Sequence, residues 1–284
     1  MSRTLRQTVA ERRCIWIDYY RYAESLSGVT APWLDKHAFI AFHTQIQSLL
    51  YSDVITLPVE AVADALVASD ESLCRAMAAK SRSVYPLRRL LEEARLRSSV
   101  ADLLGVLRAQ YVDVPLALSV PSPRRWLSIA YETAQGKPLP PDAANDRDAI
   151  ESASVYLADF LRGFAAFGVD VLLMVESSGE APADTEQLAA YQAAIVSARH
   201  CGWETGLLDA GALTAPVRSE GLDFYIAPVD TAGDGLAGNL VGVEFFDGML
   251  PVRLDQEQFY CTSIPVHAKL DDALKRLTEL RGRF

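Results

Sequence analysis

Carboxylates and arginines recur where short apolar runs of the sequence end, and these residue types do acid–base chemistry or hold anions. The run that ends at Val120 is followed by Arg124 and Arg125, and the run 170–176 ends in Glu176. A buried carboxylate has a shifted pKa and works as acid or base, whereas paired guanidinium groups bind a carboxylate in bidentate fashion. Four further polar residues take the same position in other runs: Asp53, Asp209, Asp230 and Ser263. For each of them alone, the alternative role of a helix cap or turn former stays open.

These runs have the length of strands and alternate with stretches of helical length, which predicts β/α units and a parallel sheet. The expected strands are 48–53, 115–120, 170–176, 204–209, 222–227, 240–246 and 259–264, with 15–20 as an eighth. The expected helices are 70–111 with a break at Pro86, 148–167, 184–200 and 270–281. No Gly-x-Gly-x-x-Gly follows a strand. The sequence therefore predicts an α/β fold, a single (β/α)8 TIM barrel, whose chemistry sits at the carboxyl ends of the strands.

The length of 284 residues suits one such barrel as well as two smaller domains. We expect an N-terminal helical or extended segment, 1–46, that packs on a barrel formed by 47–284. The proline-rich stretch 137–142 is the most loop-like part of the chain, and the strand–helix alternation resumes after it.

The overall charge of the chain limits its partners. The formal net charge of −10 argues against nucleic acid, because such binding rests on neutralising phosphates. No apolar stretch is long enough to cross a membrane. Four widely spaced cysteines favour a reducing compartment, so a cytoplasmic location is expected. A small-molecule carboxylate substrate is the expected partner, and a homodimer is left open.

The histidines do not form a metal-binding pattern. The four residues, at positions 37, 43, 200 and 267, include no His-Glu-x-x-His, and His200 is better explained as the end of a helix. A Gly-x-Ser-x-Gly elbow is also missing, which disfavours a serine hydrolase. We therefore expect neither a metal nor a cofactor.

Several stretches together resemble the uroporphyrinogen decarboxylase family. The segment 50–61, with Ser52 and Asp53, is similar to the family's Phe-Ser-Asp-Ile-Leu motif and its following proline. Three further segments match in order, namely 121–136, 167–177 and 240–244. The resemblance implies a TIM barrel in which Asp53 holds the pyrrole N–H groups of a substrate.

The sequence departs from this family at two of its motifs. Only Arg21 corresponds to the N-terminal arginine pair, and 261–265 has no histidine where the family has Gly-His-Gly-Ile. A substrate with eight carboxylates also needs a cationic mouth, so we expect a substrate other than uroporphyrinogen. The superfamily includes cobalamin-independent methionine synthase and the corrinoid and coenzyme M methyltransferases, whose zinc needs a His-x-Cys that 208–211 lacks.

Our main hypothesis is a cofactor-independent lyase of the decarboxylase type, acting on a small carboxylated, electron-rich ring. Asp53 would stabilise the cationic ring, Arg21 or the pair Arg124 and Arg125 would hold the carboxylate, and Tyr131 would donate or orient. The remaining residues expected to bind substrate are Glu176, Asp209, Asp230 and Ser263. Two alternatives are a zinc-independent methyl or group transferase of the same superfamily and a catalytically decayed barrel with a binding role.

Overall fold

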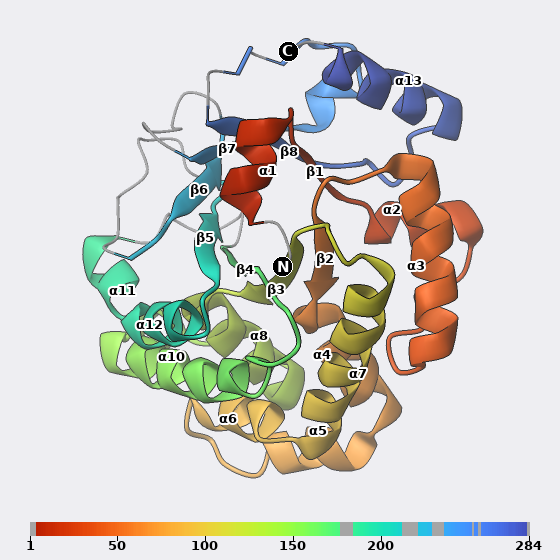
Figure 1. The fold of residues 1–284 in the computed structure, drawn as a ribbon. Helices are drawn as coiled ribbons and strands as arrows, with labels where there is room; N and C mark the ends of the chain where they lie inside the picture. The colour runs from red at the N-terminus through yellow and green to blue at the C-terminus, as the bar shows by residue number, and fades with distance from the viewer. Residues whose placement is uncertain are drawn as a thin grey trace.

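Eight parallel strands form a nearly closed barrel in the computed structural model (Figure 1). The model describes residues 4–176, 184–211, 221–228, 236–251, 253–254 and 257–282. The order around the sheet is β1-β8-β7-β6-β5-β4-β3-β2. The strand bounds are β1 (Ile15–Asp18), β2 (Ile55–Pro58), β3 (Leu116–Pro121), β4 (Val171–Val175), β5 (Glu204–Leu208), β6 (Phe224–Ala227), β7 (Ala237–Val241) and β8 (Gln258–Ser263). The predicted (β/α)8 barrel is confirmed.

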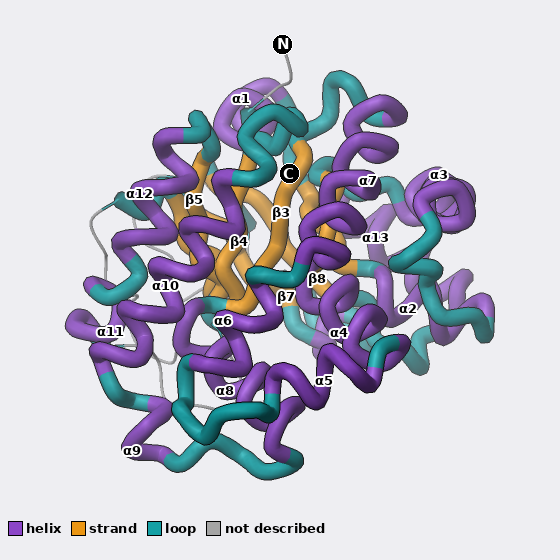
Figure 2. The backbone as a smooth tube through the Cα atoms, turned by 90° about the horizontal axis from the view of Figure 1, so that it is seen from below, coloured by secondary structure: helices purple, strands orange, loops and turns teal. Residues whose placement is uncertain are grey.

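The helices surround these strands, which lie at the centre of the molecule (Figure 2). Helices up to β3 are α1 (Leu5–Glu11), α2 (Tyr20–Ser27), α3 (Lys36–Leu50), α4 (Val59–Ser69), α5 (Glu71–Met77), α6 (Tyr85–Leu91) and α7 (Ala94–Gln110). Later helices are α8 (Pro123–Gln135), α9 (Pro141–Ala144), α10 (Arg147–Arg162), α11 (Thr185–Ala189), α12 (Gln192–His200), the 3-10 turn η2 (Val243–Phe245) and α13 (Leu270–Arg281). Pro86 stands in the first turn of α6, where its missing N–H costs nothing.

Side chains help to close the barrel between β1 and β2. The backbone N–H of Asp53 donates to the Ile15 carbonyl at 2.9 Å, and Asp53 Oδ2 accepts from the Ile15 N–H at 2.8 Å. Ser52 Oγ accepts from the Ile17 N–H at 2.9 Å. Side-chain oxygens just before β2 thus satisfy backbone donors of β1 that a longer neighbouring strand would otherwise satisfy.

The barrel interior is packed with side chains, and α1 covers its amino end. Trp16 lies against Phe224 and Phe259, with ring centroids 6.3 and 6.2 Å apart. Gly206 makes room for this packing, because a Cβ there would lie 2.2 Å from the Phe224 ring. Leu5 of α1 joins the same apolar cluster. The described residues therefore close the amino end as a floor, and TIM barrels hold their sites at the carboxyl end.

The predicted strand 48–53 is wrong. These residues form the last turn of α3, which ends in a left-handed Tyr51, and the connection to β2, which begins at Ile55. An apolar run of this length fits a buried strand and a buried helix turn equally well, so periodicity alone does not separate the two. The strand expected at 240–246 also lies earlier, at Ala237–Val241, and η2 follows it.

The N-terminal residues belong to the barrel itself. β1 pairs with β8 in parallel register, Ile15 beside Tyr260, so the expected boundary at residue 46 does not separate the barrel from the rest. Among the described helices, none is both long and apolar enough to cross a bilayer.

Candidate functional site

A cavity of about 610 Å³ lies at the carboxyl ends of β1 to β4, the mouth of the barrel. The strand ends contribute Asp18, Pro58, Pro121 and Val175, and Trp33 lies in the connection after α2. The charged side chains come from α2, α4 and α8 as well as from β1. They are Asp18, Arg21, Glu24, Glu60, Asp64 and Arg125.

Glu60 and Arg125 form an ion pair in the wall of this cavity. Arg125 Nη2 donates to Oε1 and Oε2 of Glu60 at 3.2 and 3.1 Å, and both side chains are partly exposed. Glu60 stands in the first turn of α4, directly after β2, and Ser122 Oγ caps α8 by accepting from the Arg125 N–H at 3.2 Å. Burial raises the pKa of Glu60, the guanidinium of Arg125 opposes this, and the charge of Asp64 adds to it. The pair thus presents a carboxylate of increased basicity to the cavity.

Two charged residues of the cavity make neither a salt bridge nor a hydrogen bond among the residues the structure describes. Arg21 is exposed and has no carboxylate oxygen within 4.0 Å, and Asp64 has no cationic nitrogen within that distance. Asp18 at the end of β1 accepts from Ser263 Oγ at 3.4 Å, which places Ser263 at the same mouth. The predicted positions of Arg21, Arg125 and Ser263 therefore converge on one end of the barrel.

Arg124 and Glu176 pair with each other beneath the surface. Arg124 Nη2 lies 3.0 Å from Glu176 Oε2, and these side chains are 5% and 1% exposed. Tyr191 donates to the other carboxylate oxygen of Glu176, and its hydroxyl also lies 3.4 Å from Ser122 Oγ. Neither Arg124 nor Glu176 lines the cavity, although Val175 next to them does. This buried network holds β4 to α8 and α12.

The other expected site residues lie outside the cavity lining or outside the described part. Asp209 follows β5, is nearly buried and accepts from the Gly211 N–H at 3.0 Å. Tyr131 is buried on α8 and does not line the cavity. Asp230 lies outside the described residues.

Asp53 lies at the floor of the barrel, so its predicted place at the mouth is wrong. It precedes β2 instead of ending a strand, and its Oδ1 is 3.1 Å from Arg12 Nη2 just after α1. Burial raises its pKa, while the Ile15 N–H and the charges of Arg12 and Arg281 lower it. In the structure Asp53 joins β1, β2 and the N-terminal helix. The predicted role, to stabilise a cationic ring, requires a side chain at the mouth.

The sequence reasoning missed Asp18, Glu60 and Asp64. The signal for Glu60 was present: had the strand been placed at 55–58, Glu60 would have stood at a strand's carboxyl end. Asp18 fell inside the expected strand 15–20, which in fact ends at Asp18. Asp64 lies one helical turn after Glu60 on α4, so it shares that face of the helix.

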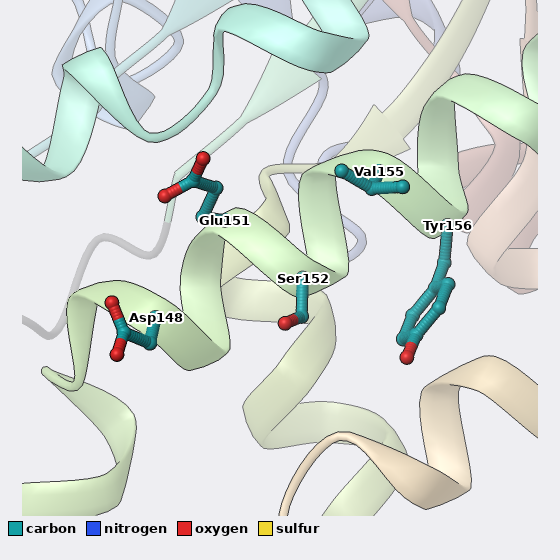
Figure 3. A pocket seen from close by; sticks show the side chains of 5 residues that line it. All are labelled: Asp148, Glu151, Ser152, Val155 and Tyr156. Carbon is teal, nitrogen blue, oxygen red and sulfur yellow. The ribbon is translucent and has the colours of Figure 1, made fainter.

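A second, smaller cavity of about 360 Å³ lies on the outer side of α10 (Figure 3). Its described lining comes from one helix only: Asp148, Glu151, Ser152, Val155 and Tyr156. None of these residues ends a strand, and the described lining contains no cation. The cavity at the mouth is therefore the candidate site.

The side chains do not fit the zinc site of the methyltransferases that the sequence resemblance brought into consideration. Within the described ranges, no three His, Cys, Asp or Glu side chains are grouped to hold a metal. Cys261 is buried in β8, and burial raises the pKa of its thiol, which opposes the thiolate that zinc binds.

Comparisons with known proteins place the chain by its fold. No protein-family model and no curated protein matches the sequence. A methyltransferase from Methanosarcina mazei is similar in structure, with a TM-score of 0.60 and 11% identity over 98% of each chain. Because this neighbour is a methyltransferase, our main hypothesis of a decarboxylase-type lyase is corrected, and the finding does not single out the uroporphyrinogen decarboxylase family. At this identity the likeness shows that the two chains share the barrel fold.

Proposed function

We propose that the chain is a methyl or group transferase whose site is the cavity at the barrel mouth. The observation that carries the proposal is the Glu60–Arg125 pair, a carboxylate of raised pKa held by a cation inside a cavity at the strand ends. The name of the structural neighbour supports the reaction type, and the place of the cavity matches where TIM barrels hold their sites.

The reaction that suits this pair is a direct displacement. The nucleophile, an amine or a thiol, attacks the methyl carbon of the donor. The bond from that carbon to the leaving group breaks, and the leaving group takes the electron pair. The proton of the nucleophile passes to the carboxylate of Glu60, whose raised pKa makes it a better base than an exposed glutamate.

The guanidinium groups would position the reactants. Arg125 holds Glu60 in one orientation, and Arg21, which has no salt-bridge partner in the described part of the chain, is free to bind an anionic group of either reactant. Orientation of this kind is a large part of the catalysis available to an enzyme that brings two reactants together.

A test of the proposal uses methyl donors labelled with carbon-13. Trimethylsulfonium and tetramethylammonium would be incubated with amine and thiol acceptors, and NMR would follow the label. We expect the label to reach at least one acceptor with the wild-type chain. Glu60→Gln, which keeps the size but not the basicity, should lower the rate by about 100-fold.

The control is Glu92→Gln, an exposed glutamate paired with Arg88 on α6, which should leave the rate unchanged. Because Glu60 must be ionised, the wild-type rate should fall as the pH drops through its raised pKa. Transfer to no acceptor, or equal rates for Glu60→Gln and the wild type, would contradict the proposal and favour a binding role for the barrel.

A further inference from the structure

The charges that line the mouth cavity are unequal in number. Its described lining holds four carboxylates, Asp18, Glu24, Glu60 and Asp64, against two guanidinium groups, Arg21 and Arg125, which is a formal excess of two negative charges. An uneven set of charges in a cavity with partly apolar walls favours ligands of complementary charge.

Protein groups already occupy some of these side chains. Glu60 forms an ion pair with Arg125, and Glu24 Oε1 accepts from the Ala31 N–H at 2.9 Å. Asp18 has the hydroxyl of Ser263 at 3.4 Å, a long contact. Asp64 and Arg21 remain, one anion and one cation of the same cavity, because among the described residues their side chains make neither a salt bridge nor a hydrogen bond.

A ligand that fills the cavity removes water from both of these side chains. A purely anionic ligand would satisfy Arg21 but desolvate Asp64, and a purely cationic ligand would do the reverse. Leaving a charge without water and without a partner is costly, so either ligand would lose affinity. A molecule that carries both charges avoids this cost.

We infer that the cavity takes a small zwitterion, a molecule with an ammonium group for Asp64 and an acidic group for Arg21. The inference rests on the proposed site but not on the proposed reaction. It narrows the substrate class to amino acids in the broad sense, including those whose two charged groups stand at opposite ends of a chain. The cavity volume of about 610 Å³ is ample for such a molecule.

The test is calorimetric titration of the full chain with four probes of equal chain length. L-norvaline carries its two charged groups on the same carbon, 5-aminopentanoate carries them at its two ends, and pentanoate and pentylamine carry one charge each. We expect one of the two zwitterions to bind at least tenfold more tightly than both single-charge probes. Which isomer binds tells whether the two protein charges act on adjacent or separated groups.

Two variants assign the charges. Arg21→Gln should lower the affinity for the zwitterion to that for pentylamine, and Asp64→Asn should lower it to that for pentanoate. The matched controls, Arg162→Gln and Asp102→Asn, remove exposed charges that do not line the cavity and should bind as the wild type does. Thermal unfolding of each variant shows whether it is folded.

Two results would overturn the inference: a single-charge probe that binds as tightly as the better zwitterion, or no binding of either zwitterion at millimolar concentration. The titration contains no methyl donor, so its result is independent of transfer. Zwitterion binding without transfer would contradict the proposed function alone, and transfer without a preference for zwitterions would contradict this inference alone.

Discussion

The two ends of the barrel use the same residue types in opposite ways. At the floor, Asp53 is almost completely covered and bonded to Ile15 and Arg12, and Glu204 at the start of β5 accepts from the Leu5 N–H of α1 at 2.6 Å. At the mouth, Arg21 and Asp64 face a cavity without a salt bridge in the described part of the chain. The difference shows that the role of a carboxylate, structural or ligand-binding, can be inferred only once it is known at which end of the barrel it lies.

The adjacent residues Arg124 and Arg125 show the same contrast over one peptide bond. Arg124 is buried against Glu176, whereas Arg125 is one-quarter exposed and paired with Glu60 at the cavity. The two positions differ because they lie on different faces of α8, one toward β4 and α12 and one toward α4. Substitution of each separates a packing role from a ligand-binding role.

The largest expected effect on stability is at Arg124. Arg124→Gln leaves the nearly inaccessible carboxylate of Glu176 without its cation, which should lower the free energy of unfolding by about 3–5 kcal/mol. Arg125→Gln is the control, and it should change stability by about 1 kcal/mol or less because water reaches both partners. Urea unfolding of the two variants checks this. Equal losses of stability would show that the buried and exposed pairs do not differ as described.

A smaller effect is expected at the floor. Asp53→Ala leaves the Ile15 N–H without its side-chain acceptor and opens the seam between β1 and β2, at a cost of about 2 kcal/mol. Asp53→Asn keeps an acceptor oxygen and should lose less. Chemical denaturation gives the free energy of unfolding of both variants. If Asp53→Ala is as stable as the wild type, the structural role of the seam is contradicted.

A pH-dependent effect is expected at His43 of α3, whose ring lies between two tyrosine hydroxyls. Its ring nitrogens are 2.9 Å from Tyr19 Oη and 3.0 Å from Tyr111 Oη, and burial lowers its pKa from 6.5 to about 3. The unfolded chain binds a proton at this histidine below pH 6.5 and the folded chain does not until about pH 3, so stability falls as the pH falls between these values.

The expected slope from this one group is about 1.4 kcal/mol per pH unit within that range. His43→Gln should remove the slope, and the exposed His37→Gln should keep it. Urea unfolding at pH 7 and pH 5 gives the comparison. The prediction fails if the wild type and His43→Gln lose the same stability between the two pH values.

The alternation of strands and helices was readable from the sequence, and most elements lie where it places them. Helix 270–281 and the strand after Pro115 are examples, because their patterns have no rival interpretation. The site was only partly readable. Arg125 was found from its type and position and Arg21 from the family resemblance, but misplacing one short strand moved Asp53 to the wrong end and hid Glu60.

Three-dimensional pairing explains what the sequence could not show. Arg124 and Arg125 are the same residue type at adjacent positions. Only the packing of α8 decides which of them faces Glu176. Asp64 and Arg21 line one cavity only because the barrel brings α2 and α4 to the same end. Contacts between residues far apart in the chain produce no pattern in the local sequence from which they could be predicted.

The claim that the mouth and not the floor is the reaction site is tested most directly by one comparison of rates. Transfer of a carbon-13 methyl group would be measured for Arg125→Gln and Asp53→Asn beside the wild type. The account predicts a loss of about 100-fold for Arg125→Gln, as for removal of a preorganised charge, and a rate within threefold of wild type for Asp53→Asn, which keeps the seam. A large loss for Asp53→Asn with an unchanged rate for Arg125→Gln would contradict it.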